Sequence, residues 1–240
     1  MDAIILHEDA ELLVVSKPPG VPVIPARDED PAASLVRRLE AGYGRLYVVH
    51  RIDRGTSGVV LFARSEAAHR FLCLQFENGR AAKTYHAITA GSPAWKDNEC
   101  ALALLPDGDR RHRTVVDQRC GKPSHTRFAV EEAFRGFALL RAEPASGRTH
   151  QIRVHLSALG LPLLCDELYG AGRPLMLSSL KPGFKKGSRT ERPLLARLAL
   201  HASALVVEHP GAGTSMRFEA GPPDDFETAL VQLRKWRSAP

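Results

Sequence analysis

Residues 46–63 read LYVVHRIDRGTSGVVLFA, and this stretch places a dense polar segment between two apolar runs. The runs LYVVH and GVVLFA at its two ends are rich in β-branched and aromatic residues, which is typical of strands. Between them, Asp53 is flanked by Arg51 and Arg54. A nearby opposite charge favours an ionised carboxylate, which can act as a nucleophile or general base. The same pattern also fits a surface ion-pair cluster that supports a turn.

Outward from this stretch, the chain predicts more strands than helices. Strand-like runs lie at 11–15, 83–91, 137–142, 200–209 and 216–220, with further short runs among basic turns in 100–140; helices are expected near 33–40, after Ser65, at 149–159 and at 224–237. Many strands follow one another in sequence, which predicts an α+β fold with a largely antiparallel sheet. No internal repeat or low-complexity linker divides the 240 residues, so we expect one domain.

One of these helices is predicted in more detail. Ser65 is a suitable N-cap, because its hydroxyl can accept a hydrogen bond from the first turn. Ala67, Phe71 and Leu74 follow at spacings of four and three, which predicts the apolar stripe of the helix. Gly79 suits the C-terminal stop.

The charge balance favours an anionic partner. The chain has 33 Lys and Arg residues against 27 Asp and Glu, a formal net charge of +6 at pH 7. Two stretches, 110–127 and 181–197, hold six basic residues each against one acid. They are Arg110, Arg111, Arg113, Arg119, Lys122 and Arg127 with Asp117, and Lys181, Lys185, Lys186, Arg189, Arg192 and Arg197 with Glu191. Such stretches are either solvated faces or contacts to phosphates.

Cysteine spacing and hydropathy indicate the compartment. Cys73, Cys100, Cys120 and Cys165 form no CxxC pair and no even framework, so we expect reduced thiols. The N-terminus is acidic where a signal peptide is basic, and no window approaches the roughly 18 apolar residues of a membrane span. The sequence therefore predicts a soluble, cytoplasmic protein.

Two further segments carry candidate site residues. In SGRTHQIRVH, Arg148 is expected where a strand meets a helix and could direct its guanidinium group to a carboxylate or phosphate. His150 and His155 are five residues apart, which does not match a zinc helix, so we expect them to pack or hydrogen-bond. In KTYHA, Tyr85 is either a half-buried strand residue or a platform on which a base stacks.

Several motifs are missing from the sequence. It contains no Walker loop, no strand-linked GxGxxG, no GxSxG and no HExxH. These absences argue against ATP, nicotinamide, serine-hydrolase and zinc-protease chemistry.

Together, the segments resemble the RluA-type pseudouridine synthases. HRIDRGTSG resembles the family's HRLDxxTSG, with Ile52 in place of leucine, and KTYHA resembles its KxYxA. SGRTHQIRVHLSALGLPLLCDELYG resembles its GRxHQxRxH segment, with Cys165 where a glycine is common. KPPG and ALHASALVVEHP match its outer elements, so the resemblance runs in order from about Leu12 to Phe218.

The resemblance implies a role for each candidate residue. Asp53 is then the catalytic aspartate, Tyr85 packs against the target base, Arg148 pairs with the aspartate, and Arg51 fills the gap left by the departing base. It also implies a single catalytic domain across residues 1–240, with core motifs over about 12–218. Its fold would be a long, mostly antiparallel mixed sheet flanked by helices, with an RNA-binding cleft across the middle.

The implied activity is isomerisation of specific uridines in structured RNA to pseudouridine. The uracil leaves its N1 attachment, rotates and re-attaches through C5, so neither a cofactor nor a metal is needed. The base must first be flipped out of its stack. The aspartate could attack the sugar, add to the base or remove the ribose 2′ proton, and each route requires an ionised carboxylate.

The expected partner is a stem-loop of transfer RNA or ribosomal RNA, with no membrane and no obligate protein partner, and we expect a monomer. Many family members carry an N-terminal RNA-binding module. Here the first family element begins by about residue 12, so we expect no such module, which favours a transfer RNA or a small stem-loop. Two rival functions stay open: a non-catalytic RNA-binding protein on this scaffold, and a metal-dependent RNA hydrolase.

Overall fold

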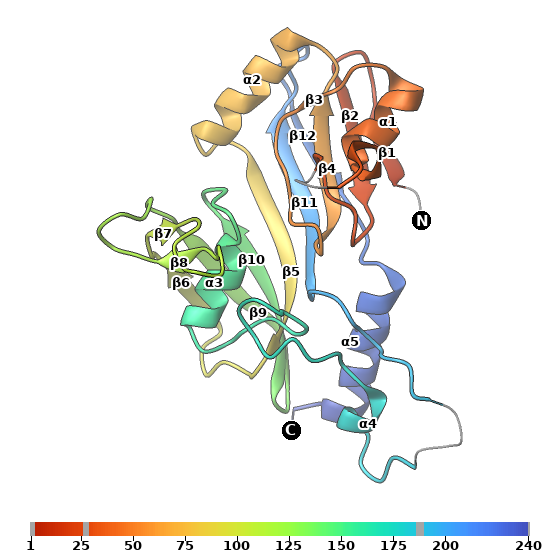
Figure 1. The fold of residues 1–240 in the computed structure, drawn as a ribbon, viewed down its shortest axis with the longest axis vertical. Coiled ribbons are helices and arrows are strands. Elements are labelled where there is room, and N and C mark those ends of the chain that lie inside the picture. Colours follow the sequence, from red (N-terminus) through yellow and green to blue (C-terminus); the bar gives the residue numbers. More distant parts are fainter. Residues whose placement is uncertain (1–2, 26–28, 186–189, 240) are drawn as a thin grey trace. The chain divides into compact units, whose positions relative to one another are not determined.

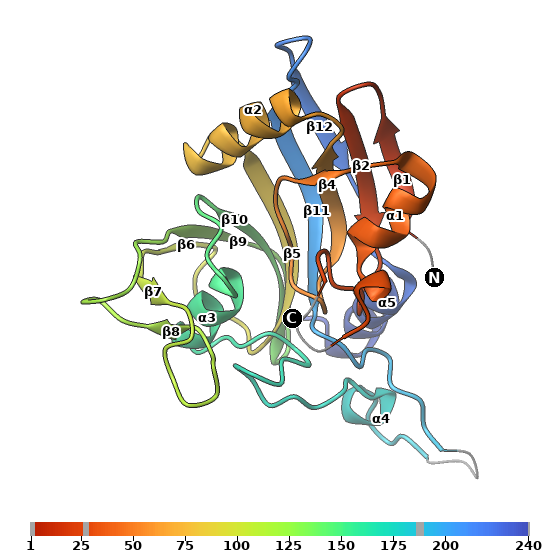
Figure 2. The ribbon, with the colours of Figure 1, turned by 45° about the horizontal axis from the view of Figure 1, so that its top comes forward.

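The computed structural model describes residues 3–25, 29–185 and 190–239. The chain forms two compact units. The first comprises Met1–Tyr85 with His201–Gly221, and the second comprises His86–Leu200 with Pro222–Pro240. Figures 1 and 2 show the elements of both units.

The first unit is a sheet with two helices. Its elements are β1 (Ile4–Glu8), β2 (Leu12–Lys17), a 3-10 turn η1 (Pro31–Ala33), α1 (Leu35–Tyr43), β3 (Tyr47–Val48), β4 (Ser57–Ala63), α2 (Glu66–Glu77), β11 (Leu200–Glu208) and β12 (Ser215–Glu219). Strand β5 (Ala82–Ala90) begins in this unit and ends in the second. The strand order is β1-β2-β4-β11-β5, with β12 paired to β11 and β3 paired to β4.

The second unit continues from β5 in the order β5-β10-β9-β6. Its elements are β6 (Asp97–Cys100), β7 (Leu104–Leu105), β8 (Val115–Val116), β9 (Thr126–Phe134), β10 (Phe137–Pro144), α3 (Gln151–Ala158), α4 (Leu177–Leu180) and α5 (Asp224–Arg237). Strands β7 and β8 form a separate small sheet. Strand β11 runs parallel to β4, while β1–β2, β2–β4, β6–β9 and β9–β10 are antiparallel. The predicted α+β class with a mostly antiparallel mixed sheet is confirmed.

The sheet of the first unit is buried on both faces, because successive strand residues point to opposite sides. On one face, α1 packs Leu35, Val36 and Leu39 against Leu13, Val15, Val60 and Phe62. On the other, α2 packs Ala68 and Leu72 against Leu12, Val14, Val59 and Leu61. This two-sided burial explains why β2 and β4 read as continuous apolar runs rather than alternating ones.

Helix α2 begins as predicted, but its buried face differs. The hydroxyl of Ser65 accepts a hydrogen bond from Ala68 N at 3.1 Å, which confirms the cap. The predicted stripe of Ala67, Phe71 and Leu74 is wrong: Ala67 is exposed, Phe71 is half-buried, and Leu74 is 46% exposed.

The buried face of α2 differs from the predicted one because it includes a glutamine. Gln75 shares the inner face with Ala68 and Leu72. Its amide donates to Glu208 O at 2.9 Å and accepts from Glu208 N at 2.8 Å, so its polar atoms are satisfied inside the unit. Apolar periodicity cannot reveal a face that includes a polar side chain.

Two strand predictions also need correction. The expected strand at 46–50 is limited to Tyr47–Val48, because the Nε2 of His50 accepts from Leu61 N at 3.0 Å and replaces a backbone partner. The edge strand β1, Ile4–Glu8, was not predicted. Its pairing with β2 shifts register between Ile5 and His7, and such an irregular strand shows little alternation.

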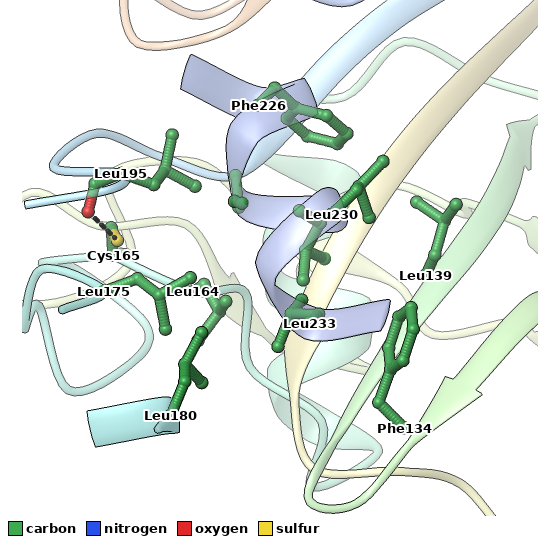
Figure 3. Packing of buried hydrophobic residues seen from close by; sticks show 13 residues of the cluster. Phe134, Leu139, Leu164, Cys165, Leu175, Leu180, Leu195, Phe226, Leu230 and Leu233 are labelled. Carbon is green, nitrogen blue, oxygen red and sulfur yellow. Dashed lines mark hydrogen bonds between the residues drawn. The ribbon is translucent and has the colours of Figure 1, made fainter. Parts of the chain in front are cut away.

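The core of the second unit forms around α5, whose predicted bounds are confirmed. Figure 3 shows Phe226, Leu230 and Leu233 of this helix among the other buried side chains of the cluster. These include Phe134 and Leu139 from β9 and β10, and Leu164, Leu175, Leu180 and Leu195 from the loops and α4.

Cys165, the departure from the family's common glycine, lies in this core. Its backbone has φ of +59°, a left-handed conformation that glycine adopts more easily than other residues. Its buried thiol donates to Leu195 O at 3.4 Å, as Figure 3 shows. The conformation explains the glycine common at this position, and the hydrogen bond of the thiol offsets part of the strain here.

Candidate active site

The candidate catalytic residue Asp53 lies in the turn between β3 and β4. Thr56 N donates to Asp53 O at 3.0 Å and closes the turn. Ile52, just before, is buried in the core with α1, so it anchors the segment. Asp53 itself is half-buried, whereas Arg51 is exposed to solvent. Burial of Ile52 also explains why isoleucine can replace the family's leucine, since only an apolar group is required.

The turn is fixed by a lysine that has no contact with water. Lys17, at the end of β2, is 0% exposed. Its ammonium donates to Pro18 O at 2.9 Å, Val21 O at 2.8 Å and Arg54 O at 3.1 Å. A buried charge is tolerated only when its polar partners replace water, and these three carbonyl oxygens do so. Lys17 thereby joins the KPPG loop to the residue after Asp53.

Arg54 completes this connection. Its Nε donates to Gly20 O at 2.9 Å, and its backbone oxygen accepts from Gly20 N at 2.8 Å. One terminal nitrogen forms an ion pair with Glu29 at 2.5 Å. Of the two arginines that flank Asp53 in sequence, Arg54 therefore stabilises the loops, and Arg51 extends into solvent.

The Thr-Ser-Gly sequence after the turn is explained by strand β11. Gly58 pairs with Ala202 in the parallel register, with φ of +113°. Ser57 hydrogen-bonds His201 across the same pair, with Oγ and Nδ1 3.0 Å apart. The other ring nitrogen of His201 bonds Ala220 O at 2.9 Å. These contacts fix where β4 begins, and hence where the Asp53 turn ends.

Tyr85 and Asp53 both lie in the first unit, and the charge of Asp53 acts on the phenol. Tyr85 lies half-buried in β5 and packs against the core that contains Ile52. Burial and the negative charge of Asp53 raise the pKa of Tyr85 above its usual range. The phenol therefore keeps its proton at neutral pH, which makes it a hydrogen-bond donor and a packing surface rather than a base.

His50 and Lys83 are two further basic residues of this unit, and the charge of Lys83 acts on the ring of His50. Burial and the positive charge of Lys83 lower the pKa of His50 to about 3, so its ring is neutral. The ring stacks on Phe76 with centroids 4.8 Å apart. Burial lowers the pKa of Lys83 to about 8. Lys83 is two residues from Tyr85, so the two side chains leave the same face of the strand.

Arg148 lies in the second unit, between β10 and α3, as predicted. Its Nε donates to Pro123 O at 3.3 Å, and its backbone N donates to Gln151 Oε1 at 3.1 Å. The same Gln151 oxygen accepts from Ser146 Oγ at 2.7 Å, and its amide nitrogen donates to Thr126 Oγ1 at 3.0 Å. Gln151 therefore holds the loop that carries Arg148. Pairing of Arg148 with Asp53 stays a prediction.

The two histidines of this segment form hydrogen bonds, as expected. His150 adopts φ of +57° and bonds the hydroxyl of Tyr169 at 2.9 Å. His155 is fully buried between Ser124 Oγ at 3.0 Å and Thr126 Oγ1 at 2.9 Å. Burial lowers the pKa of His155, so it remains neutral at physiological pH.

Some arginines of the two basic stretches form ion pairs with carboxylates. Arg113 pairs with Asp109 at 2.7 Å, and Arg127 pairs with Glu99 at 3.0 Å. Arg197 forms a two-pronged pair with Asp225, both contacts at 2.7 Å. Among the described residues of these stretches, the exposed ones without a carboxylate partner are Arg110, Arg111, Arg119, Lys122, Lys185 and Arg192. Lys186 and Arg189 lie outside the described residues.

The described ranges show no sign of a metal site or a membrane span. No group of three or more His, Cys, Asp or Glu side chains there is arranged to hold a metal ion. Nor does any described helix have the length and apolar character to cross a bilayer.

Comparison with known proteins identifies the family of the chain. The RNA pseudouridylate synthase family model matches residues 11–158, which include Asp53 and Tyr85. The chain is 36% identical over 224 residues to the dual-specificity RNA pseudouridine synthase RluA of Escherichia coli (strain K12), covering 93% of this chain and 94% of that protein. It is also 36% identical over 241 residues to the ribosomal large subunit pseudouridine synthase C of Escherichia coli O157:H7, covering 98% and 71%.

A solved structure shows the same fold. Human RNA pseudouridylate synthase domain containing 4 superposes with a TM-score of 0.75 at 25% identity, covering 96% of this chain and 93% of that one. The fold and the motifs define an RNA-modifying isomerase. The chain belongs to the RluA family of RNA pseudouridine synthases.

Proposed function

We propose that this RNA pseudouridine synthase modifies specific uridines in a stem-loop of transfer RNA or ribosomal RNA. The names of the two bacterial relatives support an RNA substrate, in one case with dual specificity and in the other from the large ribosomal subunit. A flipped-out base is the form in which an enzyme reaches a nucleotide within a structured RNA.

Asp53 is the catalytic residue in this proposal. The N1–C1′ bond breaks, the uracil rotates, the C5–C1′ bond forms, C5 loses its proton and N1 takes one up from water, so no electrons are exchanged. Asp53 is half-buried in a turn fixed by Lys17 and Ile52, which is the rigid support a catalytic carboxylate needs. The observation that carries the proposal is this half-buried carboxylate in a fixed turn, whose charge acts on the phenol of Tyr85 in the same unit.

Tyr85 and Arg51 bind the substrate in this proposal. The ring of Tyr85 packs against the target uracil, because an aromatic face stacks on a base without sequence preference. Arg51 is exposed next to Asp53, so its guanidinium can enter the space that the flipped base leaves in the RNA. When the nucleotide is extruded, Tyr85 therefore contacts the base, and Arg51 occupies the place that the base has left.

Asp53→Asn tests the proposal. The amide keeps the shape of the side chain but removes the charge, so it can act neither as nucleophile nor as base. Pseudouridine formation should fall to background, while RNA affinity stays within about tenfold, or about 1.4 kcal/mol. Tritium release from C5-labelled uridine in bulk transfer RNA measures the first quantity, and filter binding measures the second.

The matched control is Asp97→Asn, which removes the same charge from an exposed residue of β6. This control should retain the parent rate. Product formed by Asp53→Asn at a rate near that of Asp97→Asn would exclude Asp53 as the catalyst. If Asp53→Asn lost RNA binding as well as activity, the residue would be structural rather than catalytic.

Arg148 is proposed as a residue that supports the reaction, on the evidence of its motif. Arg148→Ala should lower product formation at least a hundredfold, and Arg148→Lys should restore part of it because a positive charge returns. Gln151 holds the backbone of this loop, so neither substitution should unfold the second unit. Equal activity of Arg148→Ala and the parent would remove Arg148 from the site.

Phosphate contacts are proposed for the exposed arginines of 110–127. Replacing Arg110 and Arg111 together with alanine should reduce the slope of log affinity against log salt by about 0.7–0.9 for each phosphate that is no longer neutralised. The effect should be similar for many RNAs, because phosphates carry no base sequence. An unchanged slope would identify this stretch as a solvated face.

Three further proposals follow from the family resemblance. Residues 1–240 act as one catalytic domain, the protein is a monomer, and it works in the cytoplasm. Sedimentation at micromolar concentration tests the second of these, and a sedimenting dimer would contradict it.

A further inference from the structure

Several cations lie near Trp236 at the end of α5, outside the catalytic motifs; one of them, Lys181, begins the basic stretch 181–197. The ammonium of Lys181 lies 5.3 Å from the centre of the Trp236 ring, and that of Lys235 lies 5.2 Å from it. Both contacts are of the cation–π type, which holds a lysine in place but leaves its charge uncompensated. Trp236 is half-buried and packs on the core of the second unit.

Two arginines adjoin the same tryptophan. Arg135, in the β9–β10 turn, donates from its guanidinium to Trp236 O at 3.4 Å. Arg237 donates to Ser179 O at 2.5 Å, and its own carbonyl accepts from Arg135 N at 2.7 Å. These bonds connect the β9–β10 turn, α4 and the end of α5, so the cations come from three segments that are fixed together.

Lys181, Lys235, Arg135 and Arg237 are named here the Trp236 cluster. Within the described part of the chain, no member forms an ion pair with a carboxylate, and the Nε of Arg237 is buried without an acceptor. Arg234, three residues before Arg237 on the same helix, differs: it binds Glu132 at 2.6 Å and Glu227 at 3.2 Å. Glu191, the acid of this region, accepts from Ser178 N at the start of α4.

The fixed geometry and the uncompensated charge together indicate an anionic partner. Backbone carbonyls and an aromatic ring orient the cations before any partner binds, so little side-chain entropy is lost on binding. Four adjacent cations match a chain of phosphates better than a single carboxylate. We propose that the Trp236 cluster binds the phosphate backbone of RNA, as a second contact surface outside the catalytic motifs; the choice of RNA rests on the proposed function.

The binding of bulk transfer RNA tests this inference. The double variant Lys181→Ala/Lys235→Ala should bind about tenfold more weakly at low salt. Its slope of log affinity against log salt should be less steep by about 1.4–1.8, because two phosphates are no longer neutralised. Urea unfolding of the variant should show that the core under Trp236 is intact.

The matched control is Arg80→Ala/Lys96→Ala, which removes the same charge from two exposed residues that are not in the cluster. This control should change the slope of log affinity against log salt by less than half as much as Lys181→Ala/Lys235→Ala does. Equal slopes for the two double variants would overturn the inference, because net charge alone would then explain the effect. If the double variant is unstable, Lys235→Glu serves in its place, and an unchanged slope for it would also overturn the inference.

The test does not depend on catalysis. A protein that binds RNA through the cluster but forms no pseudouridine would contradict the proposed function and leave this surface intact. A protein that forms pseudouridine, but whose salt slope is unchanged by the substitutions, would contradict this surface and leave the proposed function intact.

Discussion

Gly58 lies so close to Ala202 that a Cβ atom at position 58 would stand 2.0 Å from the carbonyl oxygen of Ala202. The φ of +113° at Gly58 is also one that other residues rarely adopt. Gly58→Ala must therefore shift the backbone where β4 begins. We expect it to lower the free energy of unfolding by about 3 kcal/mol or more, as urea denaturation can measure.

Gly42→Ala is the control for this prediction. Gly42 lies in α1, where an added Cβ would meet nothing within 4 Å. Alanine there should raise the free energy of unfolding by about 0.5–1 kcal/mol. A Gly58→Ala protein as stable as the parent would show that the parallel pair of β4 and β11 can separate without cost.

A second prediction concerns the buried ammonium of Lys17. Lys17→Met keeps most of the stem but removes the donor to Pro18 O and Val21 O and one of the two donors to Arg54 O. Because an unsatisfied buried acceptor costs about 1–3 kcal/mol, we expect a loss of stability of at least this size. The turn that holds Asp53 should loosen, so kcat should fall more than RNA affinity does.

Lys185→Met is the matched control, since Lys185 is exposed. It should leave both stability and kcat near the parent values. If Lys17→Met reduced RNA binding and kcat equally, Lys17 would act on the substrate rather than on the turn.

A third prediction uses pH. The pKa of His50 is lowered to about 3 in the folded protein, against about 6.5 in an unfolded chain. Between pH 3 and 6.5 the unfolded chain binds a proton that the folded protein does not. The free energy of unfolding therefore rises with pH in this window, by up to about 1.4 kcal/mol per unit, and is level above it.

His50→Gln should remove that part of the pH dependence. His155, whose pKa burial also lowers, is present in both proteins, so the difference between them isolates His50. Parallel curves for parent and variant from pH 4 to 7 would show that His50 takes up its proton without unfolding.

A fourth prediction concerns cofactors. Isomerisation of uridine exchanges no electrons, so purified protein should release the C5 proton from bulk transfer RNA with nothing added. Excess chelator should not slow the reaction when the RNA is prefolded and its fold is checked. Activity lost with chelator and restored by zinc or magnesium would contradict the prediction and favour a metal-dependent enzyme.

Strand and helix positions were largely predictable because local signals set them. Ser65 caps α2, and α5 spans Asp224–Arg237 as its pattern predicts. The buried face of α2 was not predictable, since Gln75 is buried only through its bonds to Glu208, a residue far along the chain.

The candidate site was also predictable only in part. Charge pattern and motif resemblance predict Asp53 and Tyr85 as site residues, and in the structure burial and the charge of Asp53 raise the pKa of Tyr85. The supports that hold Asp53 were missed, because a lysine at a strand end gives no sign in sequence that it is buried. Lys17 could have been suspected from its place directly after the apolar run LLVVS. His201 carries no comparable signal, because its partner Ser57 is fixed only by the parallel pairing.

The position of β11 in the chain affects how the protein is made. In the first unit, β4 has β11 as its parallel neighbour, yet Leu200–Glu208 emerge from a ribosome long after Ser57–Ala63. At ordinary elongation rates the delay is roughly 7 to 30 seconds. During it, Ser57 and Gly58 at the start of β4 lack their β11 partners, and an unpaired strand segment is the kind of edge that recruits strands from other chains. Newly made protein is therefore vulnerable to aggregation until Leu200–Glu208 have been translated, and slower synthesis between β4 and β11 would prolong that risk.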